Sequence, residues 1–282
     1  MWPATWIFGL CVAGAAASQQ RATLLELYDA TGGSGWANAS GWATAAADEC
    51  AWHGVTCTGG RVVALDLVEN GLDGLLPALG GLGALEELLL AENVGLSANL
   101  TSLKPVLAGN LTTLDLGSAE IVGGLPDDAF ADAPHLDLLR LASESLAGER
   151  LPSAWPAPCV LTTLSVQYSG LVGPLPAALG GCAGLTNLRL SGNHFTGALP
   201  DAWRDLASLE RLMLSAGSDN TTTEALAGPF DAVASLPALK AMAAACRDRP
   251  PPGPMGRRAG GCARRTVVLV RLCLLVVLVD FV

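Results

Sequence analysis

The chain has 282 residues, of which 51% are hydrophobic and 15% are charged, and its formal net charge is -10. This composition is apolar enough for a large core and too apolar for an intrinsically disordered chain. Seven of the sixteen Lys and Arg residues follow Cys246, so residues 18–246 carry nine basic against twenty-four acidic side chains, a net charge of -15. Such a surface repels nucleic acid and anionic lipid, which excludes nucleic acid as an expected partner.

The N-terminus has the pattern of a secretory signal peptide over residues 1–17. An apolar stretch from Trp6 to Ala13 runs into the small residues Ala15 to Ala17, which match an A-x-A cleavage site. A buried N-terminal helix is the alternative, but nothing amphipathic follows at helical spacing. We therefore expect the secretory pathway and an extracellular or cell-surface location. Export would also allow N-glycans on the four Asn-x-Ser/Thr sequons, at Asn38, Asn99, Asn110 and Asn220.

A repeated pattern, L-x-L-x-x-N-x-L-x-G-x-L-P, organises the middle of the chain with a period of about two dozen residues. It occurs in register at Leu65–Pro77, Leu114–Pro126, Leu164–Pro176 and Leu188–Pro200, and weaker copies begin at Leu88, Leu139 and Leu212. Leu65 and Leu67 alternate with Asp66, which predicts a short strand with one buried and one solvated face. A single repeat cannot bury its apolar face alone, so the coils must stack.

These repeats resemble the leucine-rich-repeat family, specifically its plant-type subclass with L-x-G-x-L/I-P in the second half of each repeat. The resemblance implies an α/β fold, a curved right-handed solenoid with short parallel strands on its concave side. Residues 61–246 would hold about seven repeats and a degenerate last one. It also implies that Asn70, Asn93 and Asn193 are buried and bond the backbone of neighbouring coils. The ladder should be irregular, because the same position elsewhere holds Ala119, Glu144, Ser169 and Gly217.

Residues 18–60 resemble the N-terminal cap of this subclass, with a helix over about 20–30, the pair Trp36 and Trp42, and a Cys-x-Trp-x-Gly-Val-x-Cys closure from Cys50 to Cys57. A cap is needed because the first coil otherwise exposes its apolar end. Cys50, His53 and Cys57 also have a spacing compatible with metal. However, a zinc site needs four ligands and no second Cys/His pair lies nearby, while export favours a disulfide. We expect a Cys50–Cys57 disulfide and neither metal nor cofactor.

The remaining cysteines leave alternatives open. Cys159 and Cys182 lie one repeat apart and would form either a bridge between neighbouring coils or two free thiols. Cys246 and Cys262 could close a C-terminal cap.

The end of the chain divides into a linker and an apolar tail. Residues 247–265 are rich in Pro, Gly and Arg, which predicts a linker. Residues 266–282 are mostly Val and Leu, interrupted by Arg271, and at about 1.5 Å per residue they fall short of a hydrocarbon core of about 30 Å. The small residues Ala259 to Gly261 before them also fit a glycolipid-anchor signal with a short spacer. We expect the tail to attach the chain to a membrane, as a lipid anchor or a span, with a mispredicted terminus as the third interpretation.

No catalytic motif stands out, so we expect no enzymatic activity. The sequence has no G-x-S-x-G, Walker or dinucleotide fingerprint, and its three histidines lack a nucleophile or carboxylate at a recognisable spacing. Asp127 and Asp128 could formally serve as paired carboxylates, but adjacent acids in a turn are usually just solvated.

The solvent-facing side of the strands, here called the strand face, is the predicted binding surface. Its residues are acidic in the early coils and basic in the late ones: Asp66, Glu87, Asp115, Arg140, Gln167, Tyr168, Arg189 and Arg211. Ordinary solubility is the default explanation of such a face, because charged residues usually face solvent. The functional interpretation is a groove for an extended peptide, in which Arg189 and Arg211 bind a carboxylate.

The resemblance implies an extracellular, receptor-like protein that binds a protein or peptide ligand. No signalling domain follows the repeats in this sequence, so a signalling co-receptor would be needed. The alternative is a secreted hydrolase inhibitor that resembles the polygalacturonase-inhibiting proteins.

Overall fold

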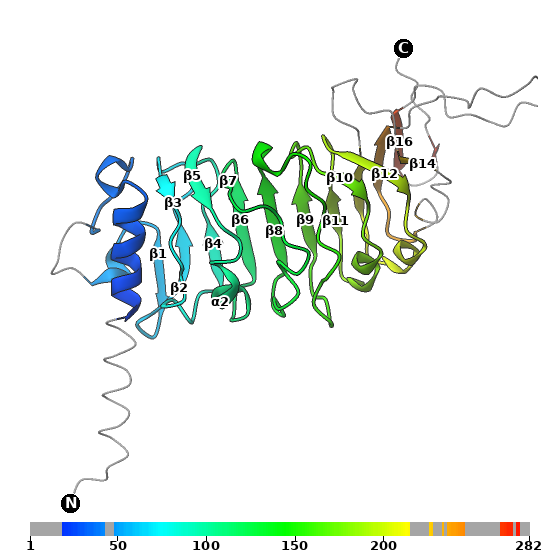
Figure 1. The fold of residues 1–282 in the computed structure, drawn as a ribbon. Helices are drawn as coiled ribbons and strands as arrows, with labels where there is room; N and C mark the ends of the chain where they lie inside the picture. The colour runs from blue at the N-terminus through cyan, green and yellow to red at the C-terminus, as the bar shows by residue number, and fades with distance from the viewer. Residues whose placement is uncertain are drawn as a thin grey trace, which may run out of the picture.

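The computed structural model describes residues 19–42, 48–214, 226–227, 233, 236–245, 266–272 and 275–276. Within them, stacked coils form a row that begins at an N-terminal helix, drawn in blue, and runs to β16 (Figure 1). The predicted signal peptide, the sequon at Asn220, both Cys246 and Cys262, and the linker over 247–265 lie outside the described residues.

One long sheet runs through every coil. Its strands, in spatial order, are β1 (Val55–Thr58), β2 (Arg61–Asp66), β4 (Glu87–Leu89), β6 (Thr113–Gly117), β8 (Leu138–Ala142), β9 (Thr163–Val166), β11 (Asn187–Arg189), β13 (Arg211–Leu214), β15 (Ala241–Ala245), β16 (Thr266–Leu272) and β17 (Leu275–Val276). From β2 to β15 all neighbours pair in parallel, whereas β1 joins β2, and β16 joins β15, in antiparallel pairs.

The register of this sheet follows the repeat. The first leucine of each copy pairs with the first leucine of the next, and all of them are fully buried: Leu65, Leu88, Leu114, Leu139, Leu164, Leu188 and Leu212. The leucine stack is therefore the core, and the alternate residues of each strand face solvent. This arrangement confirms the predicted solenoid.

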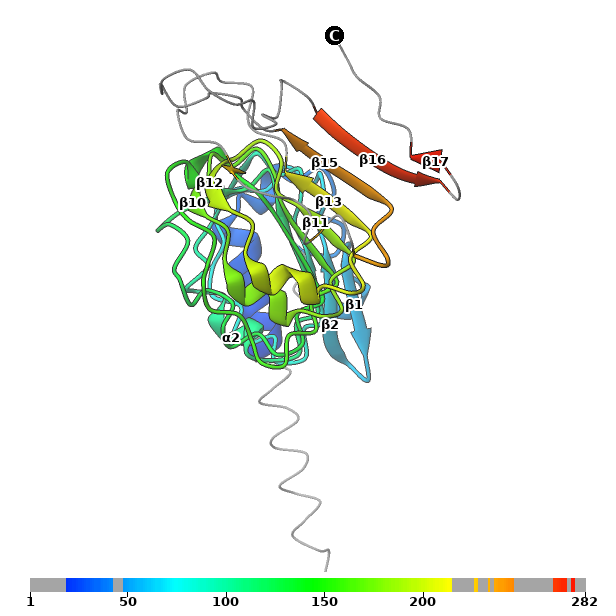
Figure 2. The ribbon, with the colours of Figure 1, turned by 90° about the vertical axis from the view of Figure 1, so that its right-hand side faces the viewer.

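Two shorter parallel ladders form a second layer. They comprise β3 (Asp73–Leu75), β5 (Gly95–Ala98) and β7 (Glu120–Ile121), then β10 (Val172–Pro174), β12 (His194–Ala198) and β14 (Leu226–Ala227). Seen from the C-terminal end, β10 and β12 lie at the upper left, and β11, β13 and β15 lie on the opposite, right-hand side (Figure 2). The coil between the two ladders has a 3-10 turn, η3 (Glu144–Leu146), in place of a strand. The second layer is thus interrupted at the coil of η3.

Short helical segments complete the connections between strands. They are η1 (Gly33–Gly35), η2 (Glu49–Ala51), α2 (Lys104–Leu107), η4 (Ala177–Gly181) and η5 (Asp201–Asp205). In η5, the fully buried Trp203 donates a hydrogen bond from its indole nitrogen to the carbonyl of Pro176, one coil earlier. Buried polar groups of this kind fix the stacking of one coil on the next.

The N-terminal cap is built on the helix over residues 19–30. Leu24 and Leu27 lie on its buried face at helical spacing, and Gly32 follows in the left-handed conformation that favours glycine. Behind the helix, Trp42 packs between Trp36 and Trp52, with ring centroids 4.9 Å from each. The aromatic cluster therefore closes the apolar end of the first coil, as the cap resemblance implies.

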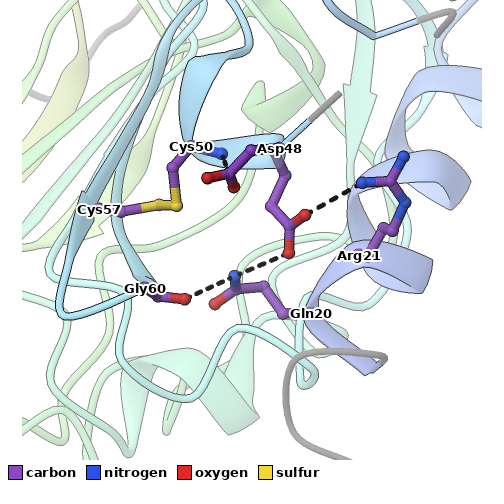
Figure 3. A network of polar contacts seen from close by, with 7 residues as sticks. Gln20, Arg21, Asp48, Cys50, Cys57 and Gly60 are labelled. Carbon is purple, nitrogen blue, oxygen red and sulfur yellow. Dashed lines mark hydrogen bonds and ion pairs between the residues drawn. A yellow bond between two sulfur atoms is a disulfide. The ribbon is translucent and has the colours of Figure 1, made fainter. Parts of the chain in front are cut away.

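A polar network joins this helix to the disulfide-closed loop (Figure 3). Cys50 and Cys57 form the predicted disulfide. The guanidinium of Arg21 lies 3.1 Å from the carboxylate of Glu49, and the amide of Gln20 donates to Glu49 and to the carbonyl of Gly60. The helix is thus held to the loop by two contacts to the Glu49 carboxylate, which are charge-assisted, and by one neutral hydrogen bond to Gly60.

The asparagine ladder confirms the implied role of the buried amides. The Asn93 side chain accepts from two backbone N–H groups of the preceding coil, and it donates to carbonyls of that coil and its own. Asn193 repeats this arrangement. In the η3 coil, where Glu144 replaces asparagine, the hydroxyls of Ser143 and Ser145 instead accept from the N–H of Ile121. The flanking serines thus satisfy the Ile121 N–H, whereas the Ala119 N–H bonds the carbonyl of Leu116 in its own coil.

Cys159 and Cys182 also form a disulfide, which resolves the alternative between a bridge and free thiols. Beyond them, the first part of the tail continues the sheet as β16 and β17. Among the described residues no helix is long and apolar enough to cross a membrane.

Candidate ligand-binding face

The strand face collects most of the predicted site residues into two rows. Asp66, Asp115, Arg140 and Arg189 occupy one register position of β2, β6, β8 and β11. Glu87 and Arg211 occupy the position two residues earlier, on β4 and β13. Gln167 and Tyr168 follow the end of β9 and lie at the edge of the sheet.

Arg140 is already paired within the protein. Its Nη1 lies 2.5 Å from Oδ2 of Asp115 on the neighbouring strand, and the other carboxylate oxygen of Asp115 accepts from the N–H of Gly117. The Asp115 side chain is only 7% exposed, against 46% for Arg140. Two residues that the sequence assigned to ligand binding therefore neutralise each other.

Arg189 and Arg211 are placed differently. Arg189 is half-buried and pairs in register with Met213, so Arg211, two residues before Met213, is its diagonal neighbour on the same face. Arg211 is exposed, and among the described residues its side chain donates one long bond, of 3.4 Å, to the side-chain oxygen of Asn187. Across the described ranges no carboxylate lies within ion-pair distance of either guanidinium. These two cations are open to an anionic group.

Asp127 and Asp128 are exposed, and each is bonded to a neighbouring coil. The Ser153 hydroxyl, and after it the Ser153 N–H, donate to Asp127 and hold the pKa of that carboxyl below its usual value. Lys104 on α2 does the same for the pKa of Asp128 through a 2.8 Å ion pair. Each carboxylate binds a different neighbouring coil, so the two do not form a catalytic pair. Among the residues the structure describes, no group of three or more His, Cys, Asp and Glu side chains is arranged to hold a metal ion.

A pocket that the sequence did not predict lies at the edge of the sheet. It has a volume of about 600 Å³ and is lined by residues 118–120 and 142–145 together with Val94 and Tyr168; we call it the edge pocket. It lies where η3 interrupts the second layer. The signal in the sequence is the loss of the ladder asparagine in consecutive copies, at Ala119 and Glu144, which predicts an irregular ladder but not a pocket.

The predicted glycosylation sites differ in exposure. Asn38 and Asn110 are exposed, whereas Asn99 is half-buried and its amide nitrogen lies against Gly123. Glycosylation at Asn38, Asn99 and Asn110 stays a prediction.

Comparison with known proteins finds leucine-rich repeats and plant receptor kinases similar to this chain. A family model described as Leucine Rich Repeat matches residues 184–206. The brassinosteroid LRR receptor kinase BRL3 of Oryza sativa subsp. japonica is 36% identical over 189 residues, a match that covers 63% of this chain and 14% of the relative. This chain is therefore similar to a plant leucine-rich-repeat receptor kinase, and it spans a small part of the length of that relative.

Solved structures agree with this assignment. The structure of PEPR1–AtPEP1 aligns with a TM-score of 0.54 at 25% identity, covering 70% of this chain and 28% of that one. The Arabidopsis receptor kinase HAESA, in complex with the peptide hormone IDA and the co-receptor SERK1, aligns with a TM-score of 0.56 at 23% identity, covering 80% and 41%. The similarity is to the repeat ectodomains of receptor kinases and not to their kinase domains.

Proposed function

We propose that this chain is an extracellular, receptor-like recognition module that binds a peptide across its strand face and depends on a co-receptor for signalling. The observation that carries the proposal is the contrast between the arginines. Arg140 is neutralised by Asp115, while Arg189 and Arg211 face solvent as diagonal neighbours with no carboxylate partner among the described residues. Two adjacent unpaired guanidiniums suit a carboxylate, such as the C-terminus of a peptide.

The comparisons support the proposal at the level of the fold. HAESA has the same solenoid, and its structure holds a peptide hormone and a co-receptor. The rice relative is a receptor kinase by name, which favours a cell-surface location for this chain as well. Attachment through residues 266–282, by a lipid anchor or a span, belongs to the proposal. Nothing in the geometry of the strand face favours the alternative function, inhibition of a hydrolase.

The experiment is a selection on the full chain from a displayed library of random linear peptides with free C-termini. Binding of a selected peptide should weaken by about 1.5–3 kcal/mol in Arg189→Ala and in Arg211→Ala, the range for charge-assisted hydrogen bonds. Amidation of the peptide C-terminus should cost a similar amount, and added salt should weaken wild-type binding. Asp132→Asn, an exposed change away from the strand face, is the control. If the wild type and both arginine variants bind the peptide with equal affinity, this part of the strand face is excluded as the peptide-binding site.

A further inference from the structure

The edge pocket has the chemistry of a site for a basic side chain. Its polar walls carry the carboxylates of Glu120 and Glu144 and the hydroxyls of residues 118, 143 and 145, and it is lined by no Lys or Arg. The Ser143 and Ser145 hydroxyls are already bonded to each other and to the backbone of Ile121. The carboxylates are therefore the groups left to meet a ligand.

Both carboxylates retain bonding capacity. Glu120 accepts one bond, from the Ser97 hydroxyl at 3.1 Å, through one of its two oxygens. Glu144 begins η3, and its carboxylate forms no hydrogen bond or ion pair with any described residue. The nearest described arginine along the sheet, Arg140, is neutralised by Asp115. The net charge of the pocket is thus negative, and each carboxylate can accept from an ammonium or guanidinium group.

The two ends of the pocket are apolar and exposed. Val94 is 84% exposed and Tyr168 is 72% exposed, which is unusual for such large hydrophobic side chains. The Tyr168 ring lies directly over Gly192, where an added Cβ would come within 2.4 Å of a ring carbon. The backbone of the next coil thus supports the ring. An aromatic face beside two carboxylates suits a guanidinium or ammonium group on an aliphatic stem.

We infer that the edge pocket binds a Lys or Arg side chain of the peptide ligand. This inference rests on the proposed function, in which Arg189 and Arg211 bind the C-terminal carboxylate, and it gives a site to a residue nearer the N-terminus of the peptide. The pocket lies at the C-terminal ends of β6 and β8, and Arg189 and Arg211 lie on β11 and β13. Neighbouring strands are about 4.8 Å apart, and two to four spacings separate β6 and β8 from β11 and β13, which is roughly 10–19 Å across the sheet. The pocket also lies beyond the row of Arg189 along the strands, so at least about three to six extended residues would span the two sites. The ligand has a basic residue at that distance from its C-terminal carboxylate.

The test uses the same displayed library on the full chain, with selection repeated on the double variant Glu120→Gln/Glu144→Gln. Peptides selected by the wild type should share a Lys or Arg at least about three to six residues before the C-terminus, and those selected by the variant should not. A synthetic consensus peptide should bind the double variant at least about tenfold more weakly, and so should the same peptide with norleucine in place of the basic residue.

A matched control removes the same charge elsewhere. Glu26→Gln/Glu86→Gln changes two exposed carboxylates outside the pocket and should leave the affinity unchanged. If peptides are selected but lack the basic residue, or bind the Glu120→Gln/Glu144→Gln variant with wild-type affinity, the pocket assignment is wrong and peptide recognition stands. If no peptide is enriched at all, both proposals are wrong.

Discussion

Asp115 on β6 and Arg140 on β8 form an ion pair across two neighbouring parallel strands, and the aspartate is nearly buried while the arginine is half-exposed. One oxygen of the Asp115 carboxylate forms this ion pair, and the other accepts a hydrogen bond from the N–H of Gly117, the last residue of β6. The pair divides the strand face into an acidic early part and a late part whose arginines lie open.

Arg140→Ala should lower the free energy of unfolding by about 1–3 kcal/mol, because it leaves a buried carboxylate without its cation. Urea denaturation of the full chain measures this. Arg189→Ala is the matched control on the same register row and should change stability by less than about 0.5 kcal/mol. Equal losses for the two variants would mean that the Asp115–Arg140 pair contributes nothing specific.

Asn93→Ala should cost about 3 kcal/mol or more, because it removes the acceptor of the Asn70 and Leu72 N–H groups and the donor to three buried carbonyls. The control is Asn187→Ala, whose half-buried amide donates one bond to the Thr186 hydroxyl and should matter little. Both values come from urea denaturation. A loss at Asn93 no larger than at Asn187 would show that water replaces the ladder bonds.

The repeat pattern predicted the strands and their register. It did not predict the contacts that form where a repeat departs from the pattern. The leucine spacing alone predicts the strand register from Leu65 to Leu212, because each coil must bury the same positions against the next. It does not show that Ser143 and Ser145 replace the missing asparagine, because that depends on where η3 turns the chain. The Cys50–Cys57 bridge followed from a motif, whereas Cys159–Cys182 needed the coil geometry to decide it.

The candidate site was predicted in the same uneven way. Alternation along a strand predicts which residues face solvent, so the rows through Arg189 and Arg211 were found. Whether a charged residue on that face is open depends on distances across strands, so the alternation does not show that Arg140 is paired with Asp115. The edge pocket arises where two consecutive coils lose the asparagine, and no single repeat shows it.

Removal of the Cys159–Cys182 bridge should lower stability by about 3 kcal/mol, as expected for a loop of this length in the chain-entropy model. The bridge has a sequence separation of 23, and Cys182 is fully buried, so Cys159→Ala/Cys182→Ala is the suitable variant. Its urea midpoint should fall relative to the oxidised wild type, with strand content by circular dichroism preserved. Loss of the strands in the native baseline would contradict the view that the stacked leucines form the fold without this bridge.

Acid should remove the contribution of the Asp127 carboxylate to the stability of the fold. The direction of this pH dependence follows from the lowered pKa of Asp127. Hydrogen bonds from the Ser153 hydroxyl and N–H favour the carboxylate in the folded protein, so the folded pKa lies below the unfolded value. The stabilisation is therefore complete above the unfolded pKa of about 4 and is lost as the pH falls through the folded pKa. Ser153→Ala should lower Tm at neutral pH, and its difference from wild type should shrink below about pH 4.

Added salt distinguishes the contribution of Asp127 to stability from that of Asp128. Lys104→Gln removes the cation that lowers the pKa of Asp128, so its effect on Tm should also shrink in acid. Because that contact joins two exposed charges, the Lys104→Gln difference should also shrink in about 1 M salt at neutral pH. The Ser153→Ala difference should persist there, since a neutral hydroxyl donates the bond. Thermal melts of both variants and the wild type, in acid and in salt, measure the four differences. A Ser153→Ala difference that stays constant from neutral pH into strong acid would show that the hydroxyl stabilises the turn without acting through the Asp127 carboxylate.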